Sequence, residues 1–107
     1  TMRESDGLAM STRNNYLSPE DRVNAPLFYQ QLVDTKLAIQ SGTDISSATE
    51  QAVDALSNIF DVEYVEVLNA NNLTEITTSS REIIIISAVS LSETRLIDNI
   101  VFRRSNV

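Results

Sequence analysis

Hydrophobic residues recur every three or four positions through the first half of the chain, a spacing that predicts helices. The first helix is expected to start at Ser18, a good N-cap, with Pro19 at the first helical position. Pro26 lies inside the same pattern, so we expect a kink there or a start moved to Asn24 as cap. Gly42 is expected to end this helix, because glycine is favoured just past the last turn.

A second helix is predicted to begin at Thr43 or Asp44, directly after the first helix ends. Its apolar face consists of aliphatic and small residues at spacings of three and four: Ile45, Ala48, Ala52, Ala55, Leu56 and Ile59. Because only a tight link joins the two helices, we expect them to form an antiparallel pair.

After residue 60 the hydrophobic period changes to two, which predicts strands over residues 62–68, 82–89 and 95–103. The second of these is apolar on both faces through Ile83–Ile86, so it is expected in the middle of the sheet. Helices followed by strands are typical of the α+β class. We therefore predict a two-helix layer packed on a small three-stranded antiparallel sheet, preceded by an irregular loop segment.

Composition limits the chemistry. The chain has 107 residues, which is one domain, and a net charge of −7 that argues against nonspecific nucleic-acid binding. It has neither cysteine nor histidine, which removes disulfides, thiolate metal sites and the commonest general base. The longest aliphatic run has four residues, too few to span a membrane, and no signal-peptide pattern opens the chain, so we expect a cytoplasmic location.

The carboxylates offer few candidates for catalysis. Glu63 and Glu66 are expected on opposite faces of the first strand, so they should not act as a pair. Asp98 interrupts an apolar strand and could be a site residue. The favoured interpretation is an outward or edge position, or a salt bridge to Arg95 or Arg81.

The sharpest candidate site is the polar run Met10-Ser11-Thr12-Arg13-Asn14 within the first seventeen residues. Adjacent hydroxyls, main-chain amides and a guanidinium can converge on a phosphate group. Taken alone, such a run is more often a solvated loop, and the chain has no Walker-type phosphate loop.

The wider sequence around this loop resembles a known family. Residues 3–14 (R-E-S-D-G-L-A-M-S-T-R-N) closely resemble the R-E-x-D-G-L-A-M-S-S-R-N signature of pantothenate synthetases, and the likeness continues through residues 16–20. Residues 61–67 resemble the family's V-D-Y-V-E-V strand, and residues 94–100 match its T-R-L-I-D-N-I ending. Thr12 departs from the usual second serine but keeps the hydroxyl.

The resemblance implies an ATP-dependent ligase of the coenzyme A pathway, which condenses pantoate with β-alanine through a pantoyl adenylate. ATP with Mg²⁺ would be the cofactor, and the full enzyme would be a homodimer. Residues 1–17 would form the hinge-side segment and ATP-phosphate loop, and residues 18–107 the C-terminal lid domain. The Rossmann-like N-terminal domain, with its histidine motif, would be absent from this chain. We therefore expect the lid alone to be inactive and its first segment to be mobile.

Site residues follow from the resemblance. Met10, Ser11, Thr12 and Arg13 match the nucleotide loop, and Arg13 would neutralise charge developing on the pyrophosphate leaving group. Met2 stands where the family usually has a valine whose main chain touches the adenine. No residue of this chain is expected to bind a metal. The alternative hypothesis is a non-catalytic interaction or assembly module of similar fold.

Overall fold

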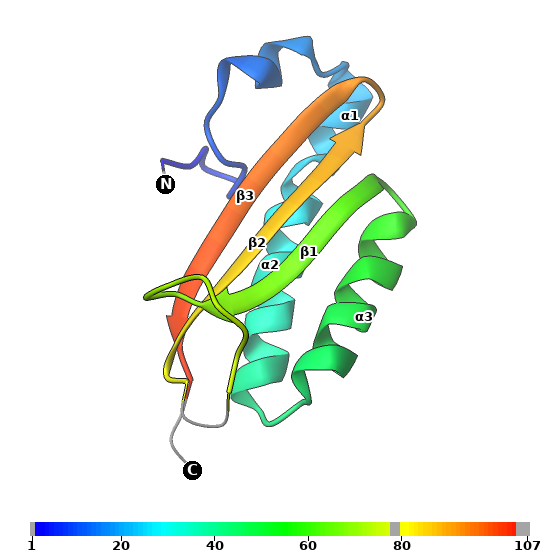
Figure 1. Ribbon diagram of the computed structural model, residues 1–107. Helices are drawn as coiled ribbons and strands as arrows, with labels where there is room; N and C mark the ends of the chain where they lie inside the picture. Colours follow the sequence, from blue (N-terminus) through cyan, green and yellow to red (C-terminus); the bar gives the residue numbers. More distant parts are fainter. Residues whose placement is uncertain (1, 78–79, 105–107) are drawn as a thin grey trace.

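The computed structural model describes residues 2–77 and 80–104, and it consists of helices followed by strands (Figure 1). The elements, in chain order, are a 3-10 helix η1 (Thr12–Tyr16), α1 (Pro19–Asn24), α2 (Pro26–Gln40), α3 (Ile45–Ser57), β1 (Asp61–Asn69), β2 (Glu82–Leu91) and β3 (Thr94–Arg103). Within these described residues, no helix is both long and apolar enough to cross a membrane.

The first predicted helix is divided at the proline. The Ser18 side chain accepts a hydrogen bond from a main-chain N–H of α1, and Ala25 separates α1 from α2. Pro26 opens α2, where its missing N–H costs nothing. The expected break is therefore confirmed, but Asn24 is not the cap: it ends α1, and α2 has no side-chain cap.

The link between α2 and α3 forms as the sequence predicts. Gly42 has a φ of +104°, and its N–H donates to the carbonyl of Ile39 while that of Thr43 donates to Ala38. These two bonds form a Schellman motif, which satisfies the last carbonyls of α2. Asp44 then caps α3 through its side chain.

The three strands form an antiparallel sheet in the order β1-β2-β3, which confirms the middle position of β2. The register of β1 shifts between Val62 and Tyr64, so that Glu63 lies in a bulge. Both Val62 and Val65 therefore pack on the core, although strict alternation would separate them. The expected alternation of the two glutamates is wrong: Glu63 and Glu66 both lie on the face away from the helices.

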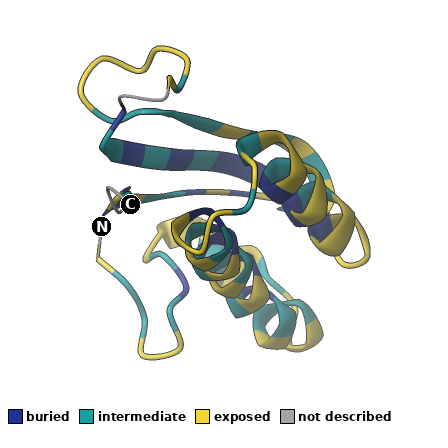
Figure 2. Cartoon of the chain, turned by 90° about the horizontal axis from the view of Figure 1, so that it is seen from below, coloured by how far each residue is buried: buried dark blue, intermediate teal, exposed yellow. Residues whose placement is uncertain are grey.

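The helix pair covers one face of the sheet, and the core lies between the two layers (Figures 1 and 2). Phe28 and Phe60 are buried there with ring centroids 6.0 Å apart, as expected for core residues. Tyr64, also expected in the core, is instead half-buried on the opposite face. No helix of the described residues lies over that outer face, where Ile97 and Val101 are 46% and 55% exposed. The fold class is thus the predicted α+β arrangement.

Candidate nucleotide site

The segment before η1 forms a short hairpin beside the edge strand β3 (Figure 1). Arg3 and Ala9 form an antiparallel bridge, and the N–H of Met10 donates to the carbonyl of Met2 at 2.8 Å. Leu8, at 3% exposure, joins the hydrophobic core. The segment is therefore more ordered in its hydrogen bonding than the irregular loop expected from the sequence.

Arg3 anchors this hairpin to the rest of the domain. Its guanidinium donates to both carboxylate oxygens of Asp98, at 2.6 Å and 2.9 Å, and to the carbonyls of Gly7 and Asn99, both at 3.1 Å. It also stacks 3.9 Å from the ring centroid of Tyr29 on α2. The hydrogen bonds to Asp98 raise the pKa of Arg3 above its usual value. One side chain thus joins the hairpin, β3 and α2.

Asp98 matches its expected position only in part. Its strand lies at the sheet edge, as one alternative had it, but its side chain does not point outward: it is only 2% exposed and faces the helix side. Its partner is Arg3, not Arg95 or Arg81. Because that partner lies 95 residues away in the sequence, no local pattern could have identified it.

The loop after the hairpin is held by its own polar side chains. The Ser11 hydroxyl oxygen accepts the N–H of Arg13 at 3.1 Å and so caps η1. Asn14 donates through Nδ2 to the carbonyl of Ala9 at 3.0 Å. Since a hydroxyl both accepts and donates, the Ser11 proton remains available to a ligand oxygen.

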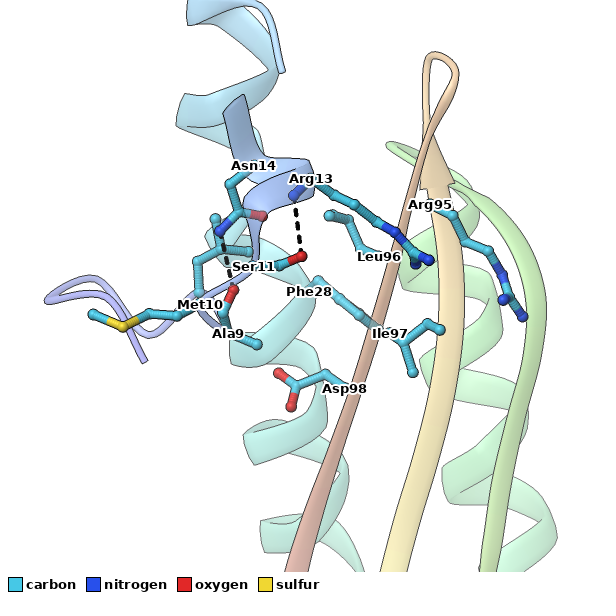
Figure 3. A pocket seen from close by; sticks show the side chains of 11 residues that line it. Ala9, Met10, Ser11, Arg13, Asn14, Phe28, Arg95, Leu96, Ile97 and Asp98 are labelled. Carbon is cyan, nitrogen blue, oxygen red and sulfur yellow. Dashed lines mark hydrogen bonds between the residues drawn. The ribbon is translucent and has the colours of Figure 1, made fainter. Parts of the chain in front are cut away.

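A cavity of about 80 Å³ lies between this loop and β3 (Figure 3). Its polar lining comes from both sides: Ser11, Arg13, Asn14, Arg95 and Asp98. The buried Oδ1 atom of Asn14 has no hydrogen-bond partner among the described residues. Pockets that enclose a drug-sized ligand measure about 300–1,000 Å³, so this cavity can surround only one small group of a larger ligand.

The predicted site residues come together only in part. Met10, Ser11 and Arg13 line the cavity, and Met2 is hydrogen-bonded to Met10 without lining it. Thr12 is exposed at the start of η1 and does not line it.

Asn14 belongs to the candidate polar run but has no predicted role, and Arg95 is not among the predicted site residues; both line the cavity. Arg95 belongs to the T-R-L-I-D-N-I stretch together with Asp98. The signal that could have found Arg95 is the presence of a charged side chain inside this second motif stretch.

The side chains offer no ready metal site. Across residues 2–77 and 80–104, no group of three or more histidine, cysteine, aspartate or glutamate residues could hold a metal ion.

Comparison with known proteins identifies the family. The model of the pantoate-beta-alanine ligase family matches residues 1–101. The chain belongs to this family. It is 43% identical over 105 residues to the pantothenate synthetase of Vesicomyosocius okutanii, covering 98% of this chain and 37% of that protein. It is 39% identical over 102 residues to that of Stutzerimonas stutzeri, covering 94% and 36%.

The fold of this family member agrees with a solved structure. Pantothenate synthetase from Thermus thermophilus superposes with a TM-score of 0.83 at 34% identity, over 94% of this chain and 37% of that one. The match is to the C-terminal region of that ligase. The chain thus spans little more than a third of the length of its relatives.

Proposed function

We propose that this chain is the ATP-lid domain of a pantothenate synthetase in the cytoplasm. In the complete enzyme, ATP and pantoate would form pantoyl adenylate and pyrophosphate, and the amine of β-alanine would then displace AMP to give pantothenate. The N-terminal Rossmann-like domain of the complete enzyme, the two substrates and a second copy of the enzyme would be its partners. The proposal rests on family membership and on one observation: Ser11 and Arg13 line the same cavity.

The cavity offers groups that suit a phosphate. The Ser11 hydroxyl donates, and the Arg13 guanidinium carries a permanent charge in a fork that fits two phosphate oxygens. Among the described residues, Arg13 has no ion-pair partner that would compete with a ligand. The whole chain carries a net charge of −7, which repels anions, so the attraction for a phosphate has to come from this local group.

Each residue of the loop has a distinct role in this proposal. Arg13 stabilises the charge that develops on the pyrophosphate leaving group, a charge that is greater in the transition state than in bound ATP. Ser11 and Thr12 bind phosphate oxygens through their hydroxyls. Met2 and Met10, joined by a main-chain hydrogen bond, present the backbone edge on which the adenine lies. Magnesium bound to ATP would supply further neutralisation of the phosphates.

The isolated chain should bind nucleotide weakly, because its cavity of about 80 Å³ can enclose only a small part of ATP. We expect a dissociation constant for Mg·ATP weaker than about 10 μM, which corresponds to a binding free energy of roughly −7 kcal/mol. Most of the binding surface would belong to the N-terminal domain.

Titration of the chain with Mg·ATP, followed by amide NMR shifts, tests the binding half of the proposal. Shifts should concentrate in residues 10–14, and Arg13→Ala should weaken binding by about tenfold, as expected for the loss of a charge-assisted hydrogen bond. Arg103→Ala is the matched control, because it removes the same charge from the opposite end of β3. Equal effects of the two substitutions would show that only net charge matters, and would contradict the proposal.

A chimera tests the catalytic half. This chain would replace the matching region of the Thermus thermophilus enzyme, and pantothenate and AMP formation would be measured. Arg13→Ala should lower kcat by about 10²-fold, the usual cost of removing one donor that stabilises transition-state charge. A folded chimera that is inactive, or that is indifferent to Arg13→Ala, would contradict the proposal.

An interaction module without catalysis is the second candidate, and the exposed apolar outer face of the sheet favours it. Ile97 and Val101 lie there without a covering layer in the described part of the chain. Such a module would not need Ser11 and Arg13 in one cavity, so a normal rate with Arg13→Ala would support it.

A further inference from the structure

We propose that Arg95 is a second anion-binding residue of this site, and that Glu63 occupies it until an anion arrives. The inference rests on the proposed function and deepens it by adding a ligand contact from β3. Arg95 lines the same cavity as Ser11 and Arg13, although it lies more than eighty residues away from them in the sequence. In Figure 3 the Arg13 side chain reaches from the loop to β3, whereas the Arg95 guanidinium is turned away from the loop toward β1, where it pairs with Glu63.

The bonding of Arg95 differs from that of the structural arginine. Arg3 donates four hydrogen bonds to protein acceptors, so its guanidinium is nearly saturated. Arg95 donates one bond, from Nε to Glu63 Oε2 at 2.6 Å, and within the described residues it has no other acceptor. Its terminal N–H groups are therefore available, and those groups form the fork that binds phosphate oxygens.

The ion pair that holds Arg95 is exposed and easily exchanged. The side chains of Arg95 and Glu63 are 45% and 43% exposed, and an ion pair in water contributes little net stability. A phosphate or pyrophosphate carries more charge than one carboxylate and has several acceptor oxygens. Such an anion, already bound by Arg13, competes effectively for the second guanidinium.

The fold explains how Glu63 reaches Arg95 across the central strand. Arg95 is paired with Ser90 of β2, which has a small side chain. Glu63 lies at the bulge of β1, where the extra residue redirects its side chain to the outer face. Without that bulge, strict alternation from Val65 would keep Glu63 on the core face.

The placement also explains why a neutralising carboxylate is useful. Arg13 and Arg95 line one cavity, so in the absence of an anion their positive charges repel each other. Glu63 offsets the charge of Arg95 without itself lining the cavity. It is therefore positioned to keep the empty site stable and to yield Arg95 to a ligand.

Titration of this chain with inorganic pyrophosphate, followed by amide NMR shifts, tests the proposal. Arg95→Gln should weaken binding by about tenfold, and Glu63→Gln should strengthen it by roughly threefold, because a competing acceptor is removed. Arg95→Lys should bind with intermediate affinity, since it keeps the charge but loses the fork. Both side chains of the pair are exposed, and an amide spectrum with unchanged dispersion checks that each variant is folded.

The controls are charge-matched. Arg103→Gln and Glu82→Gln change the net charge in the same way, in a pair 3.6 Å apart at the far end of the same sheet. If Arg95→Gln and Glu63→Gln change the pyrophosphate affinity no more than these controls do, this inference is overturned. If Arg13→Ala still weakens binding in that case, the proposed function stands. If Arg95→Gln weakens binding but Glu63→Gln does not strengthen it, the competition by Glu63 is refuted. No binding of pyrophosphate to the unmodified chain would overturn this inference and the binding half of the proposed function, while the chimera would still test the catalytic half.

Discussion

Replacing Asp98 by asparagine should destabilise the domain strongly, because it removes the counter-charge of a buried ion pair while keeping the side-chain shape. The Asp98 carboxylate accepts two bonds from Arg3, at 2.6 Å and 2.9 Å, and one from the main-chain N–H of Asn99 at 2.7 Å. An amide at this place keeps one acceptor oxygen but turns its NH2 donor toward the donors of Arg3 or toward the N–H of Asn99. The guanidinium, itself on a side chain only 20% exposed, then has no counter-charge.

The size of the stability loss depends on how many contacts Arg3 keeps in the Asp98→Asn variant. Breaking a buried ion pair by removing one partner costs about 3–5 kcal/mol. Arg3 keeps its bonds to two carbonyls and its contact with the ring of Tyr29, so the lower value of about 3 kcal/mol applies. At about 4 °C per kcal/mol for a domain of this size, the melting temperature should fall by roughly 12 °C. A loss of about 3 kcal/mol is a large part of the roughly 5–15 kcal/mol by which a typical domain is stable.

Urea denaturation of a double-mutant cycle, Arg3→Met with Asp98→Asn, measures the coupling directly. Glu63→Gln is the matched control, because its ion pair with Arg95 has the same 2.6 Å distance but is exposed to water. We expect that control to change stability by little more than the error of the measurement. A loss for Asp98→Asn that is no greater than that for Glu63→Gln would refute the argument that burial makes this pair important.

Two further predictions concern the turns and the acid range. Gly7→Ala should lower the free energy of unfolding by about 3 kcal/mol, because φ is +97° and the added Cβ would lie 2.4 Å from the ring of Tyr29. Gly42→Ala should lower it by only about 1 kcal/mol, because φ is +104° but the space around the residue is open. Equal losses in urea denaturation would contradict the ring contact. The hydrogen bond from Arg22 lowers the pKa of Asp6 below its usual value, so this pair stabilises the fold above about pH 4 and the contribution disappears as the pH falls through the lowered pKa. An NMR titration should show the Asp6 midpoint rising with Arg22→Gln, and an unchanged midpoint would contradict this cause.

The elements that could be predicted from the sequence are those whose signals are local. Ser18 and Asp44 cap helices through bonds to residues three positions ahead, and Gly42 ends a helix by its own φ angle. The aliphatic run Ile83–Ile86 identified the central strand, and β2 is indeed flanked by a strand along each edge. In each case a single segment contains all the necessary information.

The features that could not be predicted depend on contacts between segments that are distant in the sequence. The bulge at Glu63 depends on how β1 pairs with β2, and a strict period of two does not reveal it. The Arg3–Asp98 pair depends on the two ends of the chain meeting. The sequence suggests Arg95 only as a partner of Asp98, and its place in the cavity depends on the hairpin lying beside β3.

The open edge of β3 connects the stability of the domain to its candidate site. An edge strand presents unpaired main-chain groups that must be covered. Here the hairpin covers part of that edge, and Arg3 donates to the carbonyl of Asn99 while it binds Asp98. The same hairpin leads directly into Ser11 and Arg13, so the contact that protects the edge also fixes the phosphate loop against β3. In the proposed lid, the candidate loop and the sheet should therefore move as one body. Weakening the Arg3 anchor should disturb nucleotide binding without changing any residue proposed to contact the nucleotide.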